Sequence, residues 1–110
     1  MAEVYKNARL AITSSYQTIY TTPASTSSVL VSLRVTNIDG ATDDAVTVAI
    51  RDSSASADTE VASTITVPAD GTLSVTGQDK MFLEQNDTIK IKGVNASGDL
   101  IAFASILEIS

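Results

Sequence analysis

Residues 28–36 read SVLVSLRVT, and apolar and polar side chains alternate along them. The apolar side chains on one face are Val29, Val31, Leu33 and Val35, opposite Ser32, Arg34 and Thr36. Successive side chains of a β-strand point to opposite sides, so a period of two is typical of a strand with one face against a core. The segment therefore predicts such a strand.

The same alternation recurs in both directions along the chain. Residues 45–51 predict a second strand. Its inward side chains are expected to be Val46, Val48 and Ile50, and its outward ones Thr47, Ala49 and Arg51. Residues 100–109 are apolar on both faces, which predicts a strand that is covered on both sides. Shorter or weaker candidates are residues 4–12, 17–22, 61–67, 73–75 and 89–91.

Turn-forming residues separate these runs at intervals of about ten residues, as in sandwiches and barrels. Pro68-Ala69-Asp70-Gly71 places proline early in a turn and glycine where a positive φ is expected. We therefore predict an all-β chain of about eight antiparallel strands in two packed sheets, a single domain over residues 1–110, with the strand order left open. Residues 21–28 and 52–59, rich in serine, threonine and alanine, are predicted to be surface loops.

The composition excludes several kinds of chemistry. The 110 residues contain no cysteine and no histidine, which removes disulfides, thiol nucleophiles, Cys/His zinc sites and imidazole acid–base catalysis. The net charge is −6 and no basic patch is present, so direct nucleic-acid binding is not expected. The sequence predicts neither a signal peptide nor a bilayer-spanning segment, so we expect no membrane partner.

Acidic residues are the remaining candidates for a metal site. Six of them fall between residues 39 and 60: Asp39, Asp43, Asp44, Asp52, Asp58 and Glu60. Their spacing does not match the calcium loop of an EF-hand. Aspartates in the loops of β-proteins mostly form turns, so we assign no metal-binding residue, and whether this region binds a cation stays open.

Two carboxylate pairs suggest glycoside hydrolysis, Glu84 with Asp87 and Glu60 with Glu108. A glycosidase holds such a pair in a cleft that grips a sugar, usually with aromatic rings. Aromatic residues make up only 5% of this chain, which leaves little material for that cleft. We predict no catalytic or cofactor-binding residues and no enzyme activity.

The first of these pairs lies in residues 83–91, LEQNDTIKI. Residues 84–87 have the composition of a turn, because asparagine and aspartate bond their own backbone and tolerate the left-handed region. The alternating residues that follow predict a strand. We interpret the segment as a turn that sets the register of this strand, with Asn86 as its left-handed residue.

The three tyrosines of the chain, Tyr5, Tyr16 and Tyr20, all fall in the first twenty residues. Tyrosine is enriched at protein interfaces, so we name them as a candidate contact surface and expect Tyr16→Ala and Tyr20→Ala to weaken assembly more than folding. The alternative is that the N-terminal strands pack these rings over the edge of the sandwich.

A set of motifs follows in order along nearly the whole chain: IYTTP (19–23), VLVSLRVTNIDG (29–40), VTVAIRDSS (46–54), VPADGTL (67–73), LEQNDTIKI (83–91) and SILEIS (105–110). In this order they resemble a family of small virion structural proteins of tailed bacteriophages. The relatives carry glycine where Asn86 stands, and asparagine is the next best residue for a left-handed turn.

The resemblance implies a non-enzymatic virion component with an immunoglobulin-like or jelly-roll sandwich, assembled in the host cytoplasm. The leading expectation is a capsid decoration or cement protein that binds the major capsid protein as a homo-oligomer, with a trimer as one arrangement. Alternatives are a neck, tail or fibre-base component of the virion, and a bacterial surface or carbohydrate-binding module.

Overall fold

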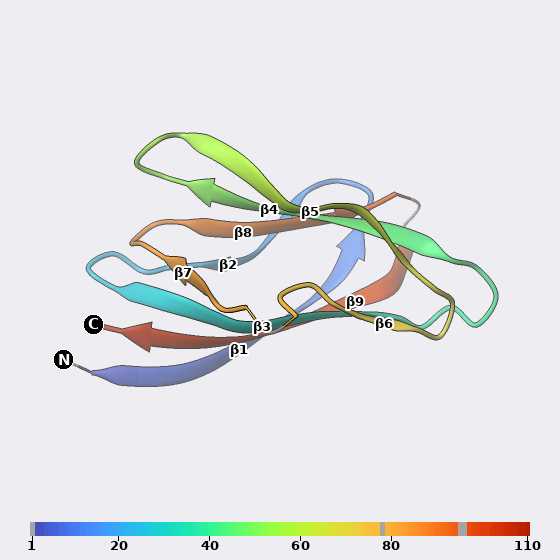
Figure 1. Cartoon of the computed structure of the whole chain (residues 1–110), viewed down its shortest axis with the longest axis horizontal. Helices are drawn as coiled ribbons and strands as arrows, with labels where there is room; N and C mark the ends of the chain where they lie inside the picture. The colour runs from blue at the N-terminus through green and yellow to red at the C-terminus, as the bar shows by residue number, and fades with distance from the viewer. Residues whose placement is uncertain (1, 78, 95–96) are drawn as a thin grey trace.

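A computed structural model describes residues 2–77, 79–94 and 97–110 and shows an all-β chain in two antiparallel sheets (Figure 1). Within these residues the strands are β1 (Glu3–Thr13), β2 (Gln17–Thr21), β3 (Ser27–Asn37), β4 (Asp44–Asp52), β5 (Ala57–Val67), β6 (Thr72–Ser74), β7 (Met81–Leu83), β8 (Thr88–Gly93) and β9 (Ser97–Ile109). The predicted fold class is confirmed, and the described residues contain nine strands where about eight were expected. The additional strand is the short β7.

The sequence left the strand order open. In each sheet, strands from the N-terminal part of the chain pair with strands from the C-terminal part. One sheet has the order β1-β9-β3-β6, with β7 also paired to β3, and the other has the order β2-β8-β4-β5. The first and last strands are neighbours, so the chain ends lie side by side (Figure 1). The described part of the chain contains no helix with the length and apolar character needed to cross a membrane.

A β-bulge in β3 changes which of its side chains reach the core. Leu30 pairs with Ile106 and Ser32 with Ser105, which leaves Val31 as the extra residue. One extra residue moves all side chains before it to the opposite face. Leu30 is therefore fully buried while Val29 is only half-buried on the outer side, so the prediction that Val29 and Val31 share the core face with Leu33 is wrong.

The core lies between the sheets and is built from inward-facing residues of seven strands. Its largest fully buried side chains are Ile12, Leu30, Leu33, Val35, Val46, Val48, Val67, Leu83, Ile89, Ile91, Leu100 and Ile106. The prediction that β9 is covered on both sides is wrong for this chain, because Phe103 on the outer side is 46% exposed. Only the β9 face that includes Leu100 and Ile106 is buried.

Strand β4 also departs from prediction on its outer side. Arg51 is exposed as expected, but Thr47 and Ala49 are buried. The pairing of β5 with β4 has two register irregularities. Thr64 on β5 has a φ of 50°, and the backbone N–H of Thr64 donates to Oγ1 of Thr47 at 3.0 Å. Ala49 is a small residue aligned between longer ones on β5 and β8, which leaves its methyl group little exposed surface.

Two turns refine the predicted loops. The segment expected to be a loop at residues 52–59 is a tight turn at 53–56, and residues 57–59 already belong to β5. In the turn after β5 the left-handed residue is Asp70, with a φ of 58°, and not Gly71 as predicted. Glycine is needed at position 71 for space, because a Cβ there would lie 2.9 Å from the carbonyl oxygen of Pro68.

Candidate functional site

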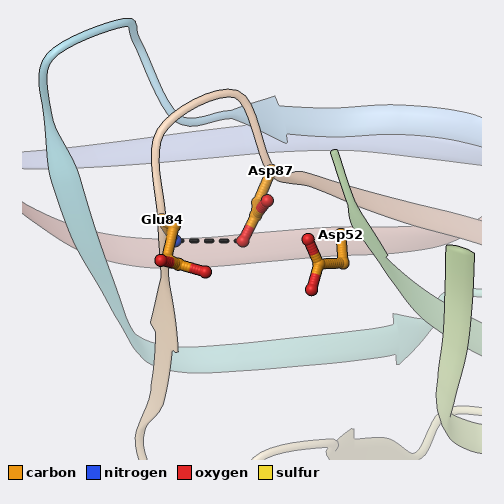
Figure 2. Close-up of side chains that lie close together, drawn as sticks. All are labelled: Asp52, Glu84 and Asp87. Atoms are coloured by element: carbon orange, nitrogen blue, oxygen red, sulfur yellow. Dashed lines mark hydrogen bonds between the residues drawn. The ribbon is translucent and has the colours of Figure 1, made fainter. Parts of the chain in front are cut away.

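The strongest cluster of chemically reactive side chains is an acidic trio at one end of the sandwich (Figure 2). Asp52 comes from the end of β4, and Glu84 and Asp87 come from the turn between β7 and β8. One carboxylate oxygen of each residue lies within 4.8 Å of the others. The fold thus adds a third acid to the pair that the sequence had singled out.

Asp87 is the buried member of this trio, and its side chain holds two loops together. It is 6% exposed, its Oδ2 accepts from the Glu84 backbone N–H at 3.0 Å, and its Oδ1 accepts from the Ser53 backbone N–H at 3.1 Å. Asn86 has a φ of 67° and β8 begins directly after the turn, which confirms the interpretation of residues 84–87 as a turn that feeds a strand. Both Asp87 carboxylate oxygens therefore stabilise the loops by accepting backbone hydrogen bonds.

Asp52 has a similar role in the β4–β5 turn. Its Oδ1 accepts from Oγ of Ser54 at 2.8 Å and from the backbone N–H groups of Ser54 and Ala55. The Ser54 hydroxyl first, and the backbone donors with it, hold the pKa of Asp52 below its ordinary value. Carboxylates that accept such bonds are typical of turns. Hard cations such as Ca²⁺ also take carboxylate oxygens, which all three members of the trio offer.

The other acids predicted between residues 39 and 60 are not gathered with Asp52. Asp39 and Asp43 accept backbone N–H bonds from Ala41 and Ala69, each at 2.9 Å, as turn-forming aspartates do. Asp58 lies on β5 and forms ion pairs with Arg51 at 3.0 Å and Lys90 at 2.6 Å. The hypothetical pair Glu60 and Glu108 is split between the two sheets.

A buried polar network that the sequence did not indicate joins the two sheets at Glu108. The Tyr20 hydroxyl on β2 donates to Glu108 Oε2 at 2.6 Å, and Lys6 Nζ lies 3.1 Å from Oε1. The bond from Tyr20, with Lys6 adding to it, lowers the pKa of Glu108. Burial and the same carboxylate raise the pKa of Tyr20 from 10.0 to about 12, so the phenol stays protonated and donates.

The three tyrosines do not form one surface. Tyr5 is 78% exposed on the outer side of β1. The ring of Tyr16 lies under the ammonium groups of Lys90 and Lys92, 5.0 and 4.6 Å from its centroid, on the four-stranded sheet. Tyr20 is half-buried and bonded to Glu108, which gives it a role in folding. Their contact with a partner stays a prediction.

Large apolar side chains gather instead on the outer side of the five-stranded sheet. Strand pairing aligns four of them in one row across β1, β9, β3 and β7: Tyr5, Leu107, Val29 and Phe82. Phe82 is 65% exposed, and Phe103 stands on the same side of β9. We call this surface, with the bulged Val31, the apolar face. The sequence signals for it were the second apolar side of residues 100–109 and Tyr5, which was named as a candidate contact residue.

The comparisons with known proteins concern the fold. A chain of the acid-stable capsid of Helicobacter pylori bacteriophage KHP30 superposes with a TM-score of 0.58 at 10% identity, covering 100% of this chain and 94% of that one. A protein of Bacillus endospore appendages, which form disulfide-linked pili, gives 0.57 at 17% identity, covering 99% and 87%. No protein-family model and no curated protein sequence matches the chain. These identities show a shared sandwich and nothing finer.

Proposed function

We propose that this chain is a non-enzymatic structural protein of a tailed-phage virion, and that it serves as a capsid decoration or cement protein. In this role it binds the major capsid protein on the outside of the shell, after synthesis in the host cytoplasm, and stabilises the shell by bridging its subunits. The observation that carries the proposal is the sandwich shared with the KHP30 capsid chain over all of this chain and 94% of that one. The ordered motifs described above point to the same class of protein.

The chemistry of the described residues supports a structural role. Asp52 and Asp87 accept hydrogen bonds from the turns around them, and the buried Glu108 accepts from Tyr20 and pairs with Lys6. A catalytic acid or base needs a partly free atom aimed at a substrate. The carboxylates of Asp52, Asp87 and Glu108 instead stabilise turns or join the sheets.

The principal alternative within the virion is a neck, tail or fibre-base component. Copy number separates the two locations, because a decoration protein occurs in hundreds of copies and a neck or tail protein in about twelve or fewer. Quantitative mass spectrometry of purified particles, referenced to the major capsid protein, gives this number directly. A ratio of about twelve per particle would replace decoration by a neck or tail position.

The similarity to spore-appendage pili favours a second candidate, a subunit of a surface filament or another bacterial surface module. The pili are disulfide-linked, whereas this chain contains no cysteine, so a filament built from it would need non-covalent contacts alone. Electron microscopy of the concentrated purified protein tests this candidate. Regular filaments would support it. If the chain is instead a carbohydrate-binding surface module, a glycan array should detect binding to a sugar.

Reconstitution tests the cement role itself. Purified protein is added to shells that lack it, and binding is measured by co-sedimentation, with heat resistance followed by light scattering. We expect saturable binding and a higher temperature of shell disruption. Wild-type protein that fails to co-sediment with the shells would reject the decoration role.

A further inference from the structure

The apolar face has a pattern of large and small residues that suits contact with an identical face. On β9 the exposed Phe103 stands beside Ser105, and a shallow hollow over Ser105 is lined by Tyr5, Asn7, Val31 and Phe103, among others. A projecting ring and a hollow therefore lie next to each other on one surface. In a two-fold contact each copy inserts its projection into the hollow of the other, because the same patch is used on both sides.

The rows across the sheet support the same arrangement. A two-fold axis that passes above the outer face at the level of Ala104, parallel to the sheet and perpendicular to the strands, brings the row of Phe103 over the row of Ser105 in the second copy. It also brings the Tyr5 row over a row of smaller residues. That smaller row, read across β1, β9, β3 and β6, is Ala11, Ile101, Thr36 and Thr72. Large side chains thus meet small ones, and Leu107 meets Ile101. Sheets that pack face to face keep their strands nearly aligned in this way.

The charges on this surface are compatible with self-contact. Pairing places Arg9 and Arg34 on either side of Phe103, and Asn7 and Ser32 on either side of Ser105. In the two-fold arrangement each guanidinium therefore lies over an amide or a hydroxyl of the other copy, which accept hydrogen bonds, and not over another arginine. The face carries slight positive charge, while the whole chain carries −6, so contact through other surfaces would face stronger repulsion.

The size of the face is also adequate. Four strand positions about 4.8 Å apart and strands of about eleven residues at about 3.3 Å each give roughly 700 Å², close to the roughly 800 Å² that each partner buries in a standard stable interface. Surfaces with an apolar centre and aromatic residues are typical of such interfaces.

We propose that two copies of this chain associate through the apolar face, with Phe103 of each copy seated over Ser105 of the other. The contact is isologous and closes at two copies. It does not depend on a role in a virion. It also accounts for the one large group of exposed apolar side chains that the described residues leave on a sheet face.

Sedimentation equilibrium of the purified chain, from about 1 to about 200 µM, tests the proposal. The monomer has a mass of 11.5 kDa, and we expect the wild type to approach about twice that mass as concentration rises. Phe103→Ser and Ser105→Arg should each raise the dissociation constant about tenfold or more, the first by removing the projection and the second by filling the hollow. Both side chains point away from the core, so the thermal midpoint measured at low concentration should stay close to that of the wild type.

Two variants on the opposite sheet serve as matched controls. Ile65 on β5 is 40% exposed, so Ile65→Ser removes a comparable exposed apolar group, and Ser63→Arg adds the same charge as Ser105→Arg. Both are expected to dimerise like the wild type. A wild type that stays monomeric at the highest concentration overturns the proposal, as does a mass near three chains. Equal weakening by Phe103→Ser and Ile65→Ser also overturns it.

Discussion

The outer faces of the two sheets differ in the side chains that they expose and in the contacts that these side chains make. On the four-stranded sheet Asp58 bridges Arg51 and Lys90, and Lys90 and Lys92 also lie over the ring of Tyr16. On the five-stranded sheet large apolar side chains are exposed on the outer side, among them Tyr5 at 78% and Phe82 at 65%. One face is therefore suited to water and the other to a partner, although both belong to the same small sandwich.

The largest expected effect on folding stability concerns the bulge in β3, which determines which residues of this strand lie on the apolar face. Leu30 is fully buried and Val31 is the extra residue on the outer side. Leu30→Ala should lower the free energy of unfolding by about 3 kcal/mol through lost burial and a cavity, whereas Val31→Ala should cost less than about 1 kcal/mol. Urea unfolding of the monomer measures both. A larger cost for Val31→Ala than for Leu30→Ala would mean that β3 continues without a bulge.

The next effect concerns the turn that follows Phe82 and β7. Asp87→Ala removes the acceptor of the Glu84 and Ser53 backbone N–H groups, and we expect a loss of about 2 kcal/mol. Hydrogen exchange should speed up at residues 84–87 before it does in β3. Glu84→Ala is the control, because its exposed side chain should be replaceable at little cost. If both variants unfold at the same denaturant concentration, Asp87 does not hold the turn.

A smaller loss of folding stability is expected at Glu108, which contacts Lys6 on β1 and Tyr20 on the opposite sheet. Tyr20→Phe leaves the buried carboxylate without its phenol donor and should cost about 1 to 2 kcal/mol. Tyr16→Ala, which leaves this network intact, is the comparison. A loss of folding stability in the Tyr20 variant no greater than in the Tyr16 variant would contradict the structural role and return Tyr20 to the candidate contact surface.

The same network predicts a dependence of stability on pH. The folded-state pKa of Glu108 is lowered, so its contribution is present above the ordinary value of 4.5 and is lost as pH falls through the folded value. The pKa of Tyr20 is raised, so its contribution is present below 10.0 and is lost between 10.0 and about 12. Thermal midpoints across pH measure both limits. In Tyr20→Phe the alkaline loss should shrink relative to the wild type.

The smallest effect is expected on the charged face. Asp58→Asn weakens two exposed ion pairs, so the thermal midpoint should fall slightly, and the difference should shrink as salt is raised because exposed charges are screened. The variant should still dimerise like the wild type. A change in dimer affinity as large as that of Phe103→Ser would show that the two faces do not differ in function.

The local pattern of the sequence predicted the strands well but not all their faces. Leu33 and Val35 are buried as their alternation predicted, and so are Ile89 and Ile91. Val29 was misassigned because a bulge depends on how β3 pairs with β9, which lies some seventy residues further along the chain. For the acidic trio, the sequence identified the turn at residues 84–87 but could not bring Asp52 to it.

The sequence by itself determined the fold class, because side-chain alternation and turn residues act over a few positions and are visible in any single segment. It also determined which chemistries are absent, since the chain has neither histidine nor cysteine. Only the tertiary structure decided that Tyr20 meets Glu108 and that Tyr5 and Phe82 share one row with β9 and β3 between them. Those contacts depend on strand order and register, which arise from pairing between distant segments, and so no local pattern encodes them.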